Sequence, residues 1–147
     1  MDDDIDRGEL LLLAVSRMHQ LQVELLGRLE ITLTLRQYRI LQRISAGYTS
    51  LSELSRLSHR SLPTISESVD GLIRRKLLSR RTSPVDRRAA LLSLTPSGRK
   101  ALGLGTACLS QLAEDFFAEL PAAKQVALTQ LGAHMHGYAA RLMWRVT

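Results

Sequence analysis

The side chains with the clearest chemistry in this sequence are cations and hydroxyls that gather between residues 61 and 88. Guanidinium and ammonium groups bind phosphate oxygens, and short hydroxyl side chains bond to phosphates and base edges while letting a backbone approach closely. The cations are Arg74, Arg75, Lys76, Arg80, Arg81, Arg87 and Arg88, and the hydroxyls are those of Ser61, Thr64, Ser66 and Ser68. This mixture predicts a surface that binds a polyanion, although a solvated charged face has the same composition.

The net charge of +6 is concentrated in the same part of the 147-residue chain. Residues 1–30 hold three arginines against seven acidic residues, residues 31–100 hold fourteen cations against four acidic residues, and residues 101–147 hold three of each. A basic segment between acidic and neutral flanks is typical of a polyanion-binding module with scaffolding on either side. Charge alone leaves the solvated face as an equal alternative.

Length and composition exclude several classes of protein. The length fits one domain, and the longest unbroken apolar run, residues 10–15, is too short to span a bilayer. The acidic start, residues 2–4, is the opposite of a cationic signal peptide, and the single Cys108 excludes an internal disulfide. We therefore expect a cytoplasmic protein with no membrane association.

No catalytic, cofactor or metal site is recognisable. The sequence has no glycine-rich phosphate loop, no nucleophile elbow and no cluster with metal-ligand spacing. His134 and His136 are two apart on a predicted helix and so point to different faces. Cys108 follows Ala107 in an apolar stretch and fits a buried structural thiol better than a redox sensor. We expect no enzyme activity, no cofactor and no metal.

The elements that must position the basic surface begin with two helices. Residues 7–30 are predicted as one long helix after an Asp6–Glu9 capping box, and its apolar stripe is wide enough to need more than one neighbour. A second capping box, Thr34–Gln37, opens a short helix that ends near Gly47. The expected core positions of this short helix are Tyr38, Leu41 and Ile44.

A helix-turn-helix follows. A third capping box, Ser50–Glu53, opens a short helix, and the polar stretch 58–60 separates it from another helix that Ser61 caps, with Pro63 in its first turn. Two short helices joined by a short polar turn are the helix-turn-helix pattern. The apolar positions of the second of these helices are Leu62, Ile65, Val69, Leu72 and Ile73, and the side formed by Ile65, Val69 and Leu72 is expected to face the core.

Beyond the helix-turn-helix the sequence predicts a hairpin and two long helices. Residues 79–82 and 89–94 flank a turn-rich basic tip at 83–88, and only the second arm has full strand length. Thr95 and Pro96 open a helix that runs to about residue 119 and contains Gly103 and Gly105, which mark a bend or a close contact. Pro121 starts the last helix, whose apolar residues recur every three or four positions.

The predicted fold class is mostly α with a small β-hairpin wing. It divides into an N-terminal dimerisation helix (1–32), a winged helix-turn-helix domain (33–95) and C-terminal dimerisation helices (96–147). The outer helices are too long and too apolar to be covered by the winged domain alone. A two-fold homodimer in which they interleave is the simplest solution.

The whole arrangement resembles the MarR family of winged helix-turn-helix transcriptional regulators. The segment 86–88 followed by 94–98, Asp-Arg-Arg and then Leu-Thr-Pro-Ser-Gly, is similar to the family's wing-to-helix pattern of Asp-x-Arg and Leu-Thr-x-x-Gly. Residues 63–66 and 72–75 resemble the start and the end of the family's recognition helix. Two positions depart from the pattern. Lys76 stands where glycine is common, which predicts a lysine at positive φ, and Glu67 stands where a basic or polar residue is more usual.

The resemblance implies which residues contact DNA. The recognition helix would present Ser61, Pro63, Thr64, Ser66, Glu67 and Ser68 to the major groove, where Glu67 could accept a hydrogen bond from a cytosine amino group. On the wing, Arg87 would enter the minor groove, and Asp86 would orient the tip by pairing with Arg88. Candidates for phosphate contacts are Arg74, Arg75, Lys76, Arg80 and Arg81, of which two or three are expected to be merely solvated.

The resemblance also implies a small-molecule pocket between the dimerisation helices and the winged domain, often for aromatic acids. Arg17, Met18 and His19 on the first helix and Tyr38 on the second would line it, with Arg17 as the partner of the anion. A core tyrosine and a surface arginine are an equally good interpretation.

The resulting hypothesis is a homodimeric regulator, most simply a repressor, that binds a pseudo-palindromic operator in double-stranded DNA and is released by a small effector. Two rival hypotheses stay open. An architectural DNA-binding protein would lack effector control. A protein-interaction module would show no salt-dependent affinity for DNA, and Glu67 is the only residue that favours this alternative.

Overall fold

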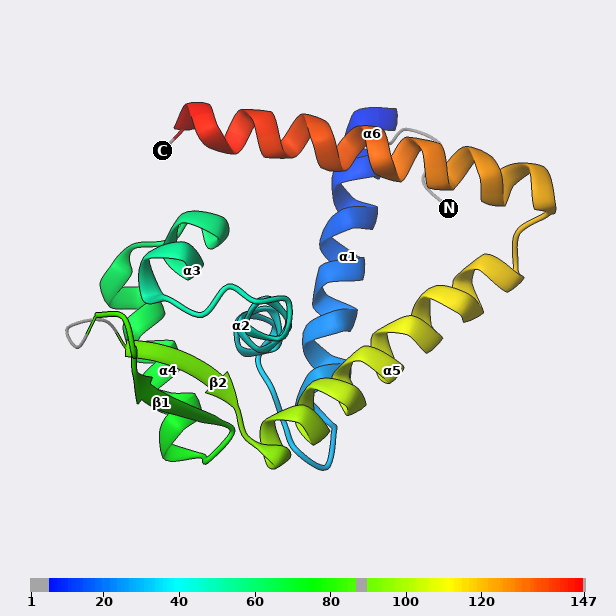
Figure 1. Cartoon of the computed structure of the whole chain (residues 1–147). Helices are drawn as coiled ribbons and strands as arrows, with labels where there is room; N and C mark the ends of the chain where they lie inside the picture. The colour runs from blue at the N-terminus through cyan, green and yellow to red at the C-terminus, as the bar shows by residue number, and fades with distance from the viewer. Residues whose placement is uncertain (1–5, 87–89, 147) are drawn as a thin grey trace.

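A computed structural model describes residues 6–86 and 90–146 of the chain. In these residues six helices and a two-stranded antiparallel sheet follow one another (Figure 1): α1 (Arg7–Gly27), α2 (Leu35–Ser45), α3 (Leu51–Ser58), α4 (Leu62–Arg74), β1 (Leu78–Thr82), β2 (Ala90–Leu94), α5 (Pro96–Ala118) and α6 (Ala122–Val146). The helices α2 to α4 and the sheet form one cluster, α1 and α5 extend away from it, and α6 crosses back towards α3 (Figure 1). The predicted fold class is confirmed.

Two of the three expected capping boxes are present. The Thr34 hydroxyl accepts from the Gln37 N–H at 3.1 Å while the Gln37 side chain accepts from the Thr34 N–H at 3.0 Å, and Ser50 and Glu53 exchange the same two bonds. The expected Asp6–Glu9 box is wrong, because the Asp6 carboxylate accepts from the N–H of Gly8, and α1 ends at Gly27 rather than near residue 30.

The ends of the short helices use left-handed residues. Gly47, at φ 101°, follows α2, where its N–H bonds to the Ile44 carbonyl and the next N–H bonds to the Arg43 carbonyl. This pair of bonds satisfies two carbonyls that the helix leaves free. His59 ends α3 at φ 50°, and Lys76 after α4 takes φ 59°, which confirms the positive φ expected there. A non-glycine residue adopts this conformation at modest strain.

The hairpin pairs five residues on each strand, from Leu78 opposite Leu94 to Thr82 opposite Ala90. The expectation that only the second arm has strand length is therefore wrong. The N–H of Leu92 also bonds to the carbonyl of Thr49, ahead of α3, at 2.9 Å. This bond anchors the sheet to the helix-turn-helix.

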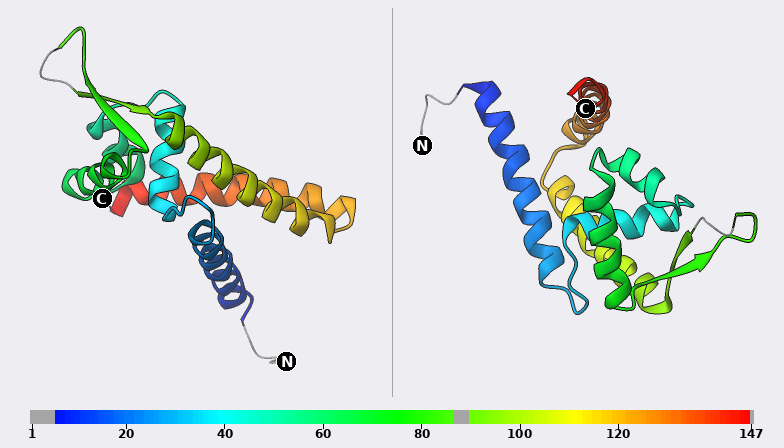
Figure 2. Two further views of the ribbon diagram at one scale, coloured as in Figure 1. Left: turned by 90° about the horizontal axis from the view of Figure 1, so that it is seen from below. Right: turned by 90° about the vertical axis from the view of Figure 1, so that its left-hand side faces the viewer.

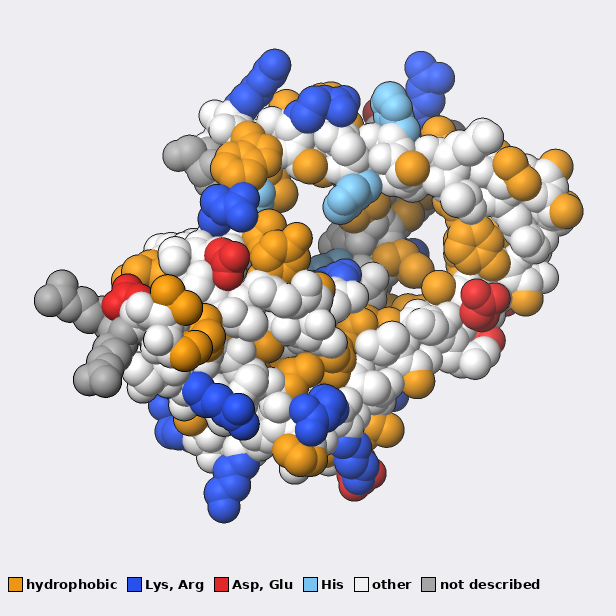
Figure 3. Space-filling model, viewed as in Figure 1, with side chains coloured by type: hydrophobic (Ala, Val, Ile, Leu, Met, Phe, Trp, Pro, Cys, Tyr) orange, Lys and Arg blue, Asp and Glu red, His pale blue; other side chains and the backbone are white. Residues whose placement is uncertain are grey.

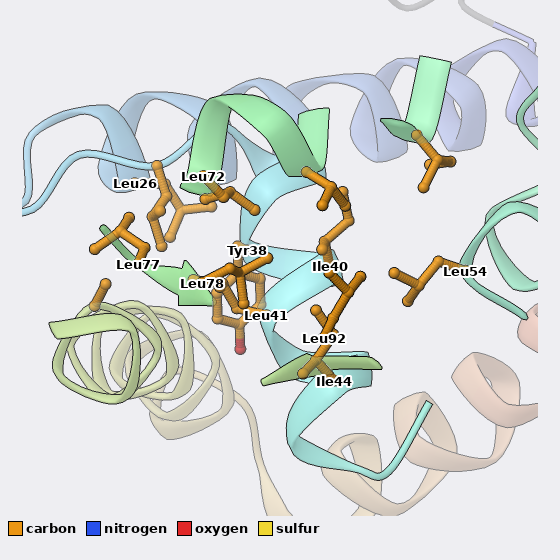
Figure 4. Packing of buried hydrophobic residues seen from close by; sticks show 14 residues of the cluster. Leu26, Tyr38, Ile40, Leu41, Ile44, Leu54, Leu72, Leu77, Leu78 and Leu92 are labelled. Atoms are coloured by element: carbon orange, nitrogen blue, oxygen red, sulfur yellow. The ribbon is translucent and has the colours of Figure 1, made fainter. Parts of the chain in front are cut away.

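One apolar core lies where α2, α3, α4 and the sheet meet the inner ends of α1 and α5. The buried side chains include Leu26 of α1, Tyr38 of α2, Leu72 of α4, Leu92 of β2 and Ala101 of α5 (Figure 4). The expected core positions Leu41, Ile44, Ile65 and Val69 are likewise buried. Leu62, predicted only as an apolar position of this helix, is 49% exposed. It lies in the first turn of α4, which projects beyond the core.

The start of α5 is locked against the end of α4. The Thr95 hydroxyl donates to the Lys76 carbonyl at 2.6 Å and accepts from the Gly98 N–H at 2.9 Å, and the Thr95 N–H bonds to the Leu77 carbonyl. A Cβ on Gly98 would lie 1.9 Å from that same carbonyl oxygen. Further along α5, a Cβ on Gly105 would lie 2.8 Å from the Tyr38 ring, which confirms a close contact there.

The outer helices leave large apolar side chains exposed in the single chain. Helix α6 has no buried residue, and its exposed side chains include Leu131, Met135, Tyr138 and Leu142. On α1 only Leu26 is buried, whereas a run from Leu10 to Leu13 lies exposed. In the part of the chain that the structure describes, no helix is long and apolar enough to cross a membrane.

Candidate nucleic-acid interface

The N-terminal turn of α4 is the part of the helix-turn-helix most open to solvent. Ser61 caps the helix, and its hydroxyl lies 3.4 Å from the Thr64 N–H and 2.7 Å from the Thr64 hydroxyl. Ser61 and Pro63 are exposed, and Thr64 and Ser66 are half-buried. A helix N-terminus offers backbone donors and a positive dipole end to a phosphate. Hydroxyls and amide donors are thus brought together at one accessible point.

The outward side of α4 carries acidic as well as neutral groups. Glu67 is exposed on the side opposite the buried Ile65, Val69 and Leu72. The Ser68 hydroxyl instead donates to the Thr64 carbonyl at 3.0 Å, within the helix. Glu67 is therefore available to an external partner, as are Ser61 and Pro63, whereas the Ser68 hydroxyl already has an acceptor.

The five candidate phosphate contacts separate into two groups. Arg75 donates to the Thr32 carbonyl at 2.6 Å and to the Gln37 side chain at 3.2 Å, so it braces α4 against α2. Arg80 forms an ion pair with Asp70 at 3.2 Å, which ties β1 to α4. Arg74, Lys76 and Arg81 are exposed and have no side-chain partner among the described residues. These three are free to meet an external anion.

The hairpin projects from the body beside α4 as a wing (Figure 2). At its tip the Ser83 hydroxyl accepts from the N–H groups of Val85 and Asp86 at 3.2 and 3.3 Å, and Val85 is 96% exposed. Arg87 and Arg88, the predicted minor-groove residue and its neighbour, lie outside the described residues. Their roles stay predictions.

The predicted ligand residues are not brought together. Tyr38 is buried, with its hydroxyl 3.2 Å from that of Thr106, while Arg17 and Met18 are exposed on α1. Only His19 lines the cavity of about 360 Å³ that lies between α1 and the helix-turn-helix. Its other lining residues are Leu35, Arg36, Arg39, Ile40, Arg43, Ser58, Arg60 and Ile65.

The four arginines of this cavity are functional candidates that were not predicted from the sequence. Arg36, Arg39 and Arg43 have the i, i+3, i+7 spacing of one helix face, a signal visible in the sequence. Partial burial, with the nearby charge of Arg39, lowers the pKa of Arg43 below its ordinary value. The Arg43 guanidinium donates to the Leu57 carbonyl at 3.0 Å.

A helix-turn-helix whose second helix lies beside a projecting hairpin defines the class of winged helix-turn-helix proteins. In the described part of the chain, no three His, Cys, Asp or Glu side chains are grouped to hold a metal ion. The site therefore offers hydroxyls, backbone donors and free cations.

Comparisons with known proteins place the chain within this class. The sequence model of the MarR family matches residues 33–90. A probable transcriptional regulator from Pseudomonas aeruginosa is 30% identical, over 90% of this chain and 98% of its own, with a TM-score of 0.70. The chain belongs to the MarR family.

More distant solved structures share the fold. Wild-type MarR from E. coli is 23% identical, with a TM-score of 0.72, over 90% of this chain and 98% of its own. FabT of Streptococcus pneumoniae, solved in complex with DNA, is 18% identical, with a TM-score of 0.83, over 92% of this chain and 96% of its own. No curated protein matches the sequence.

Proposed function

We propose that this protein is a dimeric, sequence-specific DNA-binding transcriptional regulator, most simply a repressor that a small ligand releases from its operator. The observation that carries this proposal is the open N-terminal turn of α4 beside a projecting wing, with Arg74, Lys76 and Arg81 unpaired among the described residues. The complex of the similarly folded FabT with DNA supports the same use of the fold.

In this proposal α4 enters a major groove and the wing reaches along the neighbouring backbone. Phosphates meet Arg74, Lys76, Arg81 and the N-terminus of α4, while Glu67 and the hydroxyls of Ser61, Thr64 and Ser66 face base edges. Arg75 and Arg80 instead hold α4 and β1 in place. Arg87 at the wing tip would enter the minor groove.

The dimer is built from α1, α5 and α6, the regions 1–32 and 96–147. Helix α6 buries none of its apolar side chains within one chain, and such a surface in water favours association. A closed two-fold dimer covers both copies of this surface at once. It also presents two α4 helices to successive major grooves, about 34 Å apart.

Footprinting of the purified protein on its own upstream DNA tests the proposal. We expect two protected half-sites, centred about one helical turn apart and related by a two-fold axis. Uniform protection regardless of sequence at physiological salt would instead indicate an architectural DNA-binding protein. No salt-dependent affinity for DNA would indicate a protein-interaction module.

The effector part of the proposal has a separate test. Compounds that raise the melting temperature of the protein are added to the protein–operator complex, and the fraction of bound DNA is measured. A ligand that stabilises the free protein and releases the operator supports regulation by population shift. Failure of every stabilising ligand to change DNA affinity would leave a regulator without effector control.

A further inference from the structure

Four arginines line the cavity between α1 and the helix-turn-helix, and no carboxylate of the described residues, 6–86 and 90–146, is among its lining. Arg36, Arg39 and Arg43 come from one face of α2, and Arg60 comes from the turn before α4. The ion pairs of the described residues lie elsewhere and join Arg28 to Glu24, Arg80 to Asp70 and Lys100 to Glu30. The positive charge around the cavity is therefore not neutralised by the described part of the chain.

Two of these guanidinium groups are held in position by neutral groups. Arg39 donates to the Gln42 side chain at 3.0 Å and lies over the Tyr38 ring, 5.6 Å from its centroid. Arg43 donates to the Leu57 carbonyl at 3.0 Å. These contacts fix the direction of each cation without reducing its charge. Like charges gathered in this way repel one another, and a multiply charged anion among them removes that repulsion.

The size of the cavity suits a compact anion. A volume of about 360 Å³ lies at the small end of ligand sites. Two fully buried apolar side chains, Ile40 and Ile65, contribute to its lining. Figure 3 shows a hollow beneath α6 with basic and histidine side chains visible in its depth. A compact carbon skeleton fits this space.

We propose that the cavity binds a compact organic anion with two or more acidic groups, either a polycarboxylate or a phosphate compound, in preference to an aromatic monocarboxylate. Guanidinium groups bind both carboxylates and phosphates in paired hydrogen bonds, so this chemistry is shared by the two sources. Each acidic group would meet at least one of the four arginines.

The position of the site gives it a regulatory role, a step that rests on the proposed function. His19 belongs to α1, whereas Arg60 directly precedes Ser61, the N-cap of the recognition helix. An anion held by both sides of the cavity would fix α4 relative to α1 and hence to the other half of the dimer. Binding of the anion itself does not depend on this step.

Isothermal titration of the full chain with citrate, pyrophosphate and benzoate, at constant ionic strength, tests the site. We expect citrate or pyrophosphate to bind about tenfold or more tightly than benzoate, and the tighter of the two identifies carboxylate or phosphate as the preferred group. The variant Arg36→Gln/Arg39→Gln should lose about tenfold or more in affinity. The matched variant Arg7→Gln/Arg28→Gln removes two charges outside the cavity and should bind within about twofold of the wild type.

Several results would overturn the proposal. Benzoate binding as tightly as citrate would indicate a site for a single acidic group, and equal losses in the two double variants would indicate a general charge effect. Dissociation of Arg36→Gln/Arg39→Gln into monomers would show that these arginines pair with a second chain. If this variant fails to fold by circular dichroism, the exposed Arg60→Gln provides the same comparison.

Titration of DNA with the wild-type protein separates this site from the proposed function. Anion binding without any specific DNA binding would leave the site in place and reject the regulator. Specific DNA binding without anion binding would do the reverse.

Discussion

The winged helix and the helices that extend from it differ in how far they bury their apolar side chains within one chain. Among the described residues between Leu26 and Ala101, fourteen apolar side chains are buried in one cluster, whereas α6 buries none. The apolar side chains of the winged helix are thus buried within one chain, whereas those of α6 stay exposed unless a second chain covers them. Substitutions in the first region should therefore change folding, and substitutions in the second should change assembly.

The largest effect is expected where α5 joins the winged helix. In Gly98→Ala the new Cβ would lie 1.9 Å from the Leu77 carbonyl oxygen, and a backbone group cannot move aside cheaply. We expect the free energy of unfolding to fall by about 3 kcal/mol or more, measured by urea denaturation.

Gly103→Ala is the matched control in the same helix. No atom lies within 4 Å of a Cβ at this position, so the substitution should stabilise the helix by about 1 kcal/mol. If it destabilises the protein instead, a second chain packs closely against α5 there. The position of Gly103 would then belong to the region that determines assembly.

The parts that local sequence signals determine were predicted correctly. The Thr34–Gln37 and Ser50–Glu53 boxes each need only four consecutive residues. The positive φ of Lys76 could be predicted because Lys76 occupies a position where glycine is usual. The Asp6–Glu9 box has the same pattern but does not form, because Asp6 bonds to the nearer Gly8 N–H. A capping pattern therefore locates a helix start better than it identifies the bonds there.

The candidate site depends on contacts between distant residues, and these could not be predicted. Arg75 has the sequence context of a phosphate contact, yet its acceptor is the Thr32 carbonyl, 43 residues earlier. The cavity needs His19 and Arg60 on one side of α2, a placement that only the tertiary structure provides. The arginine spacing on α2 was visible, but it does not show which side of the helix is concave.

The next largest effect is expected on α6. Leu131→Glu places a charge on its exposed apolar stripe, where Leu131 is 59% exposed in the single chain. If the stripe forms the dimer interface, the dissociation constant of the dimer should rise about a hundredfold, measured by sedimentation equilibrium, because a buried unpaired charge costs several kcal/mol. Thr129→Glu adds the same charge about 160° around the helix and should leave the dimer intact. Equal behaviour of the two variants would argue against this interface.

Smaller effects are expected for the cations of the winged helix, some of which should affect DNA binding and others stability. Arg74→Gln and Arg81→Gln remove free cations, so each should lower the slope of log K against log salt by about 0.9 for DNA. Arg75→Gln removes two internal hydrogen bonds and should instead reduce the free energy of unfolding by about 1 kcal/mol. Binding titrations at several salt concentrations, with thermal denaturation of the same samples, measure both. A reduced slope in Arg75→Gln alone would reverse the assignment.

The smallest effect compares the two capping boxes. Hydrogen bonds from the side chain and the backbone of Ser50 hold the pKa of Glu53 below its ordinary value. Because the folded pKa is depressed, this contribution is present above the unfolded pKa, about 4.3, and is lost as the pH falls through the folded value. Glu53→Gln should therefore reduce the loss of melting temperature as the pH falls below about 4.3, measured by thermal denaturation.

The Thr34–Gln37 box serves as the internal control because its amide does not titrate. Gln37→Ala should lower the melting temperature by the same amount at every pH. An unchanged loss of melting temperature at low pH in Glu53→Gln would show that the α3 cap, like that of α2, stabilises its helix without a contribution from charge.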